Sequence, residues 1–183
     1  MIKTVFNDIV TPELSKGAIL NKEFQGFEQD YLVLHCLLRK YRPKSLLEIG
    51  TNFGTGTNII CNALPSADVY SLELPLGEGD EPLNQGGRDM TGRNCKFRFT
   101  QLRGNSLYFD YDAYPCEAYY VDGGHYYENV LAETEGILRQ MPDLVIYHDT
   151  DIPEVLQAIK DAMNTDYELY RVTDTRISYL LRK

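Results

Sequence analysis

Two short stretches of this 183-residue chain combine histidine and aspartate in a way that could support proton transfer or metal binding. The first reads VDGGHYYENV and contains Asp122 and His125, and the second reads IYHDTD and contains His148 and Asp149. Because histidine titrates near neutral pH, His125 is a candidate general base for a hydroxyl group, with Asp122 and His148 beside it. Paired carboxylates suit a hard cation such as Mg²⁺, which makes Asp122 and Asp149 candidate metal ligands.

Other interpretations of these four residues stay open. Asp122 and Asp149 could cap the helices that follow them, and His125 could be a hydrogen-bonded structural residue. Two histidines and a carboxylate also suit iron or zinc, so His125, His148 and Asp149 could belong to a metal-dependent hydrolase or oxygenase. A protein that binds a cofactor without catalysis is a third alternative, because a fold and a cofactor site do not guarantee activity.

The glycine-rich stretch LLEIGTNFGTGT is the strongest local signal in the chain. Glu48, Gly50, Gly54 and Gly56 follow an apolar run and precede a helical pattern, which indicates a strand, a glycine turn and a helix. Glycines let the backbone turn sharply and approach a ligand, and the helix N-terminus favours a carboxylate there. The spacing fits neither the dinucleotide fingerprint nor the phosphate-binding loop with its lysine, so an NAD enzyme is disfavoured.

Polar residues follow the next two predicted strands. Glu73 ends a strand expected over 69–74, where a carboxylate can accept hydrogen bonds from both hydroxyls of a ribose. Asn105 and Ser106 follow a strand expected over 96–102, and polar side chains there could meet the edge of an adenine ring. A chance acidic residue and ordinary turn formers are the alternatives at these positions.

Strand and helix patterns alternate along the chain, which predicts a Rossmann-like, doubly wound, mostly parallel α/β sheet of seven strands. In such a sheet the ligand site lies outside the carboxyl ends of the strands. A C-terminal antiparallel hairpin is expected over 167–172 and 176–181. The other expected strands are 46–49, 69–74, 96–102, 118–121 and 144–149, and the expected helices are 25–41, 57–63, 127–139 and one that starts near Pro153.

The length suits one domain, with an N-terminal helical segment over 1–43 and the sheet core over 44–183. A net charge of −9 disfavours nucleic acid as a partner, because its phosphates would be repelled. Basic residues between 88 and 103 alternate with Phe97 and Phe99, which favours an amphipathic strand over a phosphate site. The chain lacks a secretory signal pattern and a long apolar run, so a cytoplasmic location without a membrane partner is expected.

Taken together, these motifs resemble the class I S-adenosylmethionine-dependent methyltransferases. The likeness is narrower to a small-molecule branch, similar to methyltransferase domain 24, with Asp-Gly-x-His after strand four and His-Asp after strand five. It runs from about Phe24 to the terminal hairpin. It implies that the glycine turn holds the methionine part of S-adenosylmethionine, that the strand-two carboxylate holds the ribose, and that adenine lies beside the residues after strand three. The cofactor-binding residues so implied are Glu48, Gly50, Thr51, Asn52, Phe53, Gly54, Gly56, Glu73, Leu74, Asn105, Ser106 and Asp122.

The resemblance also implies methyl transfer to the hydroxyl of a small molecule such as a sugar or another hydroxylated metabolite. Members of that branch can bind a divalent metal through acidic residues at the ends of strands four and five, here Asp122 and Asp149. The motif reads DGGH where an acidic residue often stands third, which weakens the assignment of Mg²⁺. The methyl group would face Asp122, His125 and His148, and a glycine-rich loop over 77–92 could close over the acceptor. The acceptor and the oligomeric state are not implied.

Overall fold

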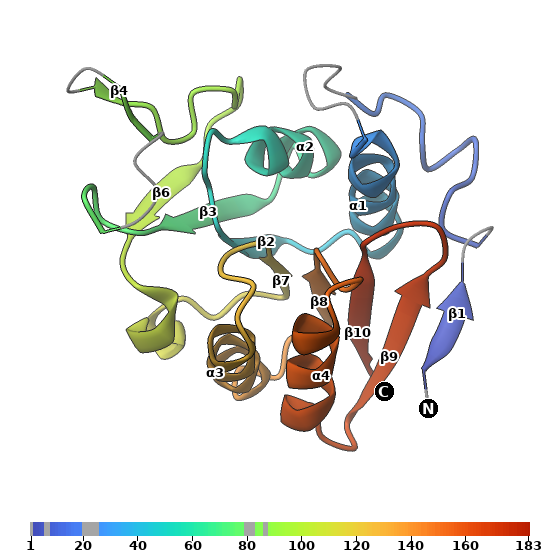
Figure 1. Cartoon of the computed structure of the whole chain (residues 1–183). Coiled ribbons are helices and arrows are strands. Elements are labelled where there is room, and N and C mark those ends of the chain that lie inside the picture. Colours follow the sequence, from blue (N-terminus) through green and yellow to red (C-terminus); the bar gives the residue numbers. More distant parts are fainter. Residues whose placement is uncertain (1, 6–7, 20–25, 79–82, 86–87) are drawn as a thin grey trace.

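Apolar runs at the expected positions build one mixed sheet, whose strand order is β6-β3-β2-β7-β8-β10-β9-β1 (Figure 1). The computed structural model describes residues 2–5, 8–19, 26–78, 83–85 and 88–183, and within them this sheet has eight strands. The main strands are β1 (Lys3–Val5), β2 (Ser45–Ile49), β3 (Asp68–Glu73), β6 (Thr100–Arg103), β7 (Ala118–Val121), β8 (Leu144–Tyr147), β9 (Tyr167–Val172) and β10 (Ser178–Arg182).

Neighbouring strands run parallel except around β10, which pairs antiparallel with both β8 and β9. This arrangement confirms the predicted Rossmann-like class and the C-terminal antiparallel hairpin. The additional strand, β1, lies parallel to β9 at the edge of the sheet. Residues 1–43, expected to be a helical segment, therefore include a strand as well as a helix.

Four helices flank the sheet in the described part of the chain, with α1 and α2 on one face and α3 and α4 on the other (Figure 1). Because side chains alternate along a strand, Leu46 of β2 packs into the core beneath α1 and α2, and Leu47 packs into the core on the opposite face. Burial on both faces explains why the central strands read as continuous apolar runs. The helices are α1 (Glu28–Tyr41), α2 (Thr55–Ala63), α3 (Tyr127–Leu138) and α4 (Pro153–Ala162).

The strand predicted over 96–102 is wrong at its start. β6 begins at Thr100, and the four residues before it are not part of a strand. The backbone N–H of Lys96 instead donates a hydrogen bond of 3.0 Å to Asn58 Oδ1 of α2, which holds this segment against the helix. The alternation of basic and aromatic residues there is therefore not the alternation of a strand.

In the described ranges, no helix combines the length and the apolar character needed to cross a membrane.

Candidate functional site

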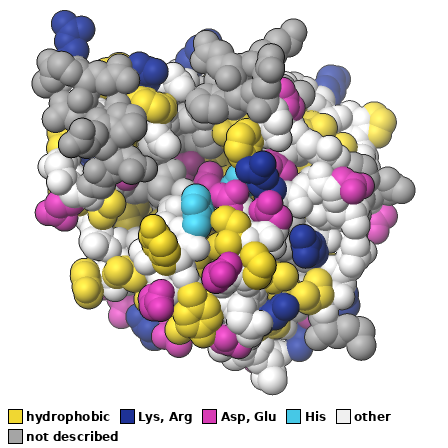
Figure 2. All heavy atoms as spheres, viewed as in Figure 1, with side chains coloured by type: hydrophobic (Ala, Val, Ile, Leu, Met, Phe, Trp, Pro, Cys, Tyr) yellow, Lys and Arg dark blue, Asp and Glu magenta, His cyan; other side chains and the backbone are white. Residues whose placement is uncertain are grey.

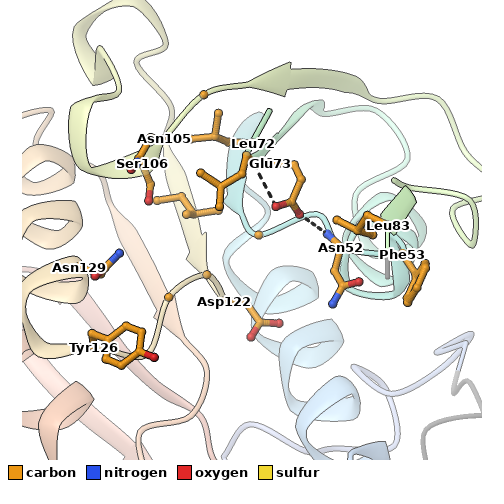
Figure 3. Close-up of a pocket in the computed structure, with 16 residues that line it drawn as sticks. Asn52, Phe53, Leu72, Glu73, Leu83, Asn105, Ser106, Asp122, Tyr126 and Asn129 are labelled. Carbon is orange, nitrogen blue, oxygen red and sulfur yellow. Dashed lines mark hydrogen bonds between the residues drawn. The ribbon is translucent and has the colours of Figure 1, made fainter. Parts of the chain in front are cut away.

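A cavity of about 440 Å³ opens at the carboxyl ends of β2, β3, β6 and β7 (Figure 3). Its size falls within the usual range for small-molecule sites. Of the twelve residues expected to hold a cofactor, four do not line this cavity, namely Glu48, Thr51, Gly54 and Gly56. The eight that do line it are Gly50, Asn52, Phe53, Glu73, Leu74, Asn105, Ser106 and Asp122.

The glycine turn brings the end of β2 close to the neighbouring strands. Gly50 has a φ of 95°, and a Cβ atom there would overlap the backbone carbonyl oxygen of Asp122 after β7. Gly54 has a φ of 83°, and a Cβ atom there would lie 2.6 Å from the Cα atom of Gly92. Both positions therefore need glycine for two reasons, the backbone conformation and the close approach of another segment.

Glu73 lies at the end of β3 and points toward the glycine turn (Figure 3). Its Oε2 accepts a hydrogen bond of 2.6 Å from the backbone N–H of Asn52, and its Oε1 accepts one of 3.0 Å from the backbone N–H of Leu74. These two donors fix the orientation of the carboxylate at the cavity wall. Each carboxylate oxygen has more than one lone pair, so both can still accept a hydrogen bond from a ligand hydroxyl.

Glu48 lies beneath the glycine turn. The side chain is 1% exposed, and its Oε2 accepts hydrogen bonds of 2.5 Å from the hydroxyls of Thr57 and Ser71. Burial raises the pKa of Glu48 to about 8. Gly56 leaves room for this carboxyl group, because a Cβ atom there would lie 2.6 Å from Glu48 Oε1. Glu48 therefore supports the turn from below, with a carboxyl group that is largely protonated at neutral pH.

Replacing Glu48 with glutamine is expected to change how stability depends on pH. The folded protein holds a proton on Glu48 up to a pH of about 8, whereas the unfolded chain releases it near 4.5, so this group destabilises the fold as pH rises between those values. The free energy of unfolding of Glu48→Gln, relative to that of the wild type, should therefore rise by about 1.4 kcal/mol per pH unit in that window. Urea unfolding of both proteins at pH 5, 6, 7 and 8 measures it, and a constant difference would contradict it.

The four predicted histidine and aspartate residues do meet at the strand ends. Nδ1 of His148 lies 2.8 Å from Asp149 Oδ2 and 3.3 Å from Asp122 Oδ1, and Nε2 of His125 lies 2.9 Å from Asp149 Oδ2. In the space-filling view, histidine and acidic side chains gather near the middle of the visible face (Figure 2). Asp122 also lines the cavity, so the cluster and the cavity adjoin.

Asp30, which no sequence motif indicates, is a further member of this cluster. Asp30 of α1 is 4% exposed, and its Oδ2 lies 3.3 Å from Nε2 of His148. It stands in the first turn of a helix, where acidic residues are common because they interact well with the helix dipole. The sequence around it therefore carries no signal that separates this carboxylate from an ordinary one.

Opposite charges control the protonation of this cluster. Burial opposes a charge on His148, yet the nearby carboxylates of Asp122, Asp149 and Asp30 raise its pKa to about 12. A hydrogen bond to Asp149 raises the pKa of the half-exposed His125, although burial opposes this shift in part. Burial raises the pKa of Asp149, but hydrogen bonds to the two histidines outweigh it and hold this pKa well below its usual value.

The cluster also has the composition of a cation site. One ligand atom each from Asp122, His148 and Asp149 lie within 4.8 Å of one another. His125 lies outside this group, among the residues that the structure describes. The geometry therefore gathers the two carboxylates that were expected to bind metal, together with His148, and His125 joins them through its contact with Asp149.

The loop expected over 77–92 is described only in part, since residues 79–82 and 86–87 lie outside the described residues. The remainder contains the short strands β4 (Asn84–Gln85) and β5 (Arg88–Asp89). Gly92 N–H donates to the carbonyl oxygen of Asn52 at 2.9 Å, and Leu83 lines the cavity. The described part thus contacts the glycine turn, and closure over an acceptor stays a prediction.

No protein-family model matches the chain. The uncharacterized protein y4gI of Sinorhizobium fredii is 25% identical over an alignment of 154 positions that covers 72% of this chain. The match covers 17% of y4gI, so this chain spans about a sixth of the length of that relative.

Solved methyltransferase structures superpose on most of the chain. The S-adenosylhomocysteine-bound methyltransferase PaMTH1 of Podospora anserina has a TM-score of 0.63 and 11% identity, covering 85% of this chain and 79% of its own. TomG, an O-methyltransferase of tomaymycin synthesis from Streptomyces achromogenes in complex with S-adenosylmethionine, has a TM-score of 0.61 and 16% identity, covering 95% and 91%. MycE of the mycinamycin pathway, in complex with Mg and S-adenosylhomocysteine, has a TM-score of 0.58 and 15% identity, covering 95% of this chain and 55% of its own. The chain therefore has the fold of these methyltransferases and spans about half the length of MycE.

Proposed function

We propose that this protein is an S-adenosylmethionine-dependent methyltransferase that methylates a hydroxyl group of a small molecule. The observation that carries this proposal is the position of Asp122, which lines the cavity and also belongs to the histidine and aspartate cluster. A cofactor held along the strand ends would place its reactive end beside that cluster. Proteins of the same fold are bound to S-adenosylmethionine or S-adenosylhomocysteine, which supports this choice of cofactor.

The cavity and the adjoining glycine turn suit the two ends of such a cofactor. Glu73 offers an anchored carboxylate to a ribose, and Asn105 and Ser106 provide polar groups beside an adenine ring. The α2 N-terminus follows the glycine turn and favours the carboxylate of the methionine part. When bound, the cofactor supplies an activated methyl group on its sulfonium centre.

His125 is the group proposed to act on the acceptor. Its side chain is 51% exposed, and its Nε2 contacts Asp149 Oδ2, which leaves Nδ1 free to accept the proton of a hydroxyl group. Asp149 stabilises the imidazolium that this transfer creates. Because the methyl donor is already activated, holding the hydroxyl in line with it would supply much of the remaining acceleration.

A divalent cation is proposed at Asp122, His148 and Asp149. This donor set fits a cation, because two carboxylates carry the charge that a divalent ion needs and the imidazole adds a neutral ligand. A cation here would polarise the acceptor hydroxyl and lower its pKa. Mg is present in the structure of MycE, which shares the fold, and this supports the proposal. The acidic charge of the chain favours a small-molecule acceptor over nucleic acid.

S-adenosylhomocysteine is expected to raise the melting temperature of the wild-type protein. Ligand at about 100 times its dissociation constant stabilises by roughly 2.7 kcal/mol, which corresponds to a shift of about 5 to 10 °C for a domain of this size. Glu73→Ala should abolish the shift, because it removes the carboxylate that would bind the ribose. Differential scanning fluorimetry measures both proteins.

The matched control is Glu78→Ala, which removes the same charge from an exposed position a few residues away. That variant should keep the full shift. A wild-type protein that shows no shift at millimolar S-adenosylhomocysteine would refute the proposed cofactor and favour the metal-dependent hydrolase or oxygenase. A shift that survives in Glu73→Ala would leave the cofactor in place and remove the proposed role of Glu73.

A further inference from the structure

Asp30 is a buried carboxylate with two separate partners. Its Oδ1 accepts a hydrogen bond of 3.0 Å from the backbone N–H of Arg176, in the connection between β9 and β10. Its Oδ2 lies 3.3 Å from His148 Nε2. A buried carboxylate is costly unless it is paired and hydrogen-bonded. Asp30 thus links α1, the hairpin connection and the end of β8 at one point.

The two ring nitrogens of His148 have different surroundings. Nε2 faces a single acceptor, Asp30, whereas Nδ1 faces oxygens of both Asp122 and Asp149. The His148 side chain is 6% exposed, and Nδ1 has no hydrogen-bond partner among the described residues, because neither nearby carboxylate is correctly aligned. A nitrogen lone pair buried against two carboxylates is repelled unless a positive charge lies between them.

Packing also restricts the ring of His148. The ring of Phe27 stacks on it with a centroid distance of 5.8 Å and an interplanar angle of 29°, and the guanidinium carbon of Arg176 lies 4.4 Å from the centre of the Phe27 ring. The imidazole is therefore held in one plane, with one edge toward α1 and the other toward the strand ends. Its orientation is set before any ligand arrives.

We propose that Asp30 is a positioning residue that accepts the Nε2 proton of His148, so that the Nδ1 lone pair binds a divalent cation together with Asp122 and Asp149. This inference rests on the cation site of the proposed function. A carboxylate that orients a metal-binding histidine through its other ring nitrogen is a recurrent arrangement in proteins. Imidazole suits first-row transition metals, whereas Mg²⁺ prefers oxygen ligands, so Mn²⁺ should bind more tightly than Mg²⁺.

The substitution Asp30→Asn tests this role with almost no change in shape. Because the N–H of Arg176 needs an acceptor, the amide oxygen of the asparagine is expected to replace Oδ1, and the amide nitrogen then faces His148 Nε2. A donor at that position favours the tautomer with the proton on Nδ1. In that tautomer, Nδ1 has no lone pair with which to bind a cation. The dissociation constant for Mn²⁺, measured by isothermal titration calorimetry, should rise by about 10- to 100-fold.

Asp151→Asn is the matched control. Asp151 is also paired with Arg176, at 3.9 Å, but its side chain is 50% exposed. This control loses the same charge and should bind Mn²⁺ as the wild type does. Nitrogen-15 NMR of the imidazole supplies a second measurement: without Mn²⁺, both ring nitrogens of wild-type His148 should carry protons, because carboxylates face each of them, whereas Asp30→Asn should lose the proton on Nε2. Wild-type affinity for Mn²⁺ in Asp30→Asn, or a proton that stays on Nε2 of His148 in Asp30→Asn, would overturn the inference.

Binding of S-adenosylhomocysteine, measured on the same samples, separates this inference from the proposed function. If the wild type binds S-adenosylhomocysteine but not Mn²⁺, the role of Asp30 is refuted and the methyltransferase proposal stands. If Mn²⁺ binds and Asp30→Asn weakens it while S-adenosylhomocysteine does not bind, the role of Asp30 is supported and the methyltransferase proposal fails.

Discussion

Gly50→Ala is expected to destabilise the protein by about 3 kcal/mol or more and to abolish the binding of S-adenosylhomocysteine. The backbone of Gly50 has a φ of 95°, which an alanine rarely adopts, and the new Cβ atom would overlap the carbonyl oxygen of Asp122. That oxygen belongs to the backbone, so relief requires the ends of β2 and β7 to separate. Separation would distort the cavity wall on both sides. Urea unfolding and isothermal titration calorimetry measure the two effects.

Gly77→Ala separates the backbone strain from the overlap. Gly77 has a similar φ of 91°, but no described atom lies within 4 Å of a Cβ atom placed there. That variant should lose only about 1 to 2 kcal/mol from the unfavourable backbone conformation and should bind S-adenosylhomocysteine normally. If Gly50→Ala is no less stable than Gly77→Ala and binds the ligand equally well, the close approach of β2 and β7 is not what shapes the cavity.

The sheet could be predicted because most of its strands carry their own signal. Residues 118–121 and 144–147 are apolar throughout, as expected of strands buried on both faces, and turn residues bound them. β1 has no such signal. It is three residues long and partly exposed, and its partner β9 lies more than 160 residues away in the chain. That segment is extended because it pairs with β9 at the edge of the folded sheet.

The cluster at the strand ends was predictable from topology alone. Parallel strands place their carboxyl ends at one edge of the sheet, so residues that follow β7 and β8 must meet there. Asp30 could not be found in this way, because it comes from a helix that packs against that edge. Glu48 shows a different limit, since both faces of β2 are buried and alternation cannot tell which side chains reach a ligand.

His125→Ala is expected to lower kcat for methyl transfer by about 10²- to 10⁴-fold, the usual contribution of a general base. The histidine lies outside the group of cation ligands and is half-exposed, so folding should change little. Its Nδ1 has no hydrogen-bond partner among the described residues and can take the hydroxyl proton, whereas the buried His148 is enclosed by the carboxylates of Asp30, Asp122 and Asp149. Transfer of a labelled methyl group to an acceptor found by screening hydroxylated small molecules measures the loss.

The control for this loss is Glu128→Gln, an exposed residue of the same segment, in the first turn of α3. It should keep the wild-type kcat. A proton-transfer role predicts that His125→Ala lowers kcat with little change in KM, because the residue acts in the transition state more than in binding. A raised KM with an unchanged kcat would instead make His125 an acceptor-binding residue. In that case a cation at Asp122, His148 and Asp149 would be the group that activates the hydroxyl. Substitutions that weaken Mn²⁺ binding would then lower kcat most.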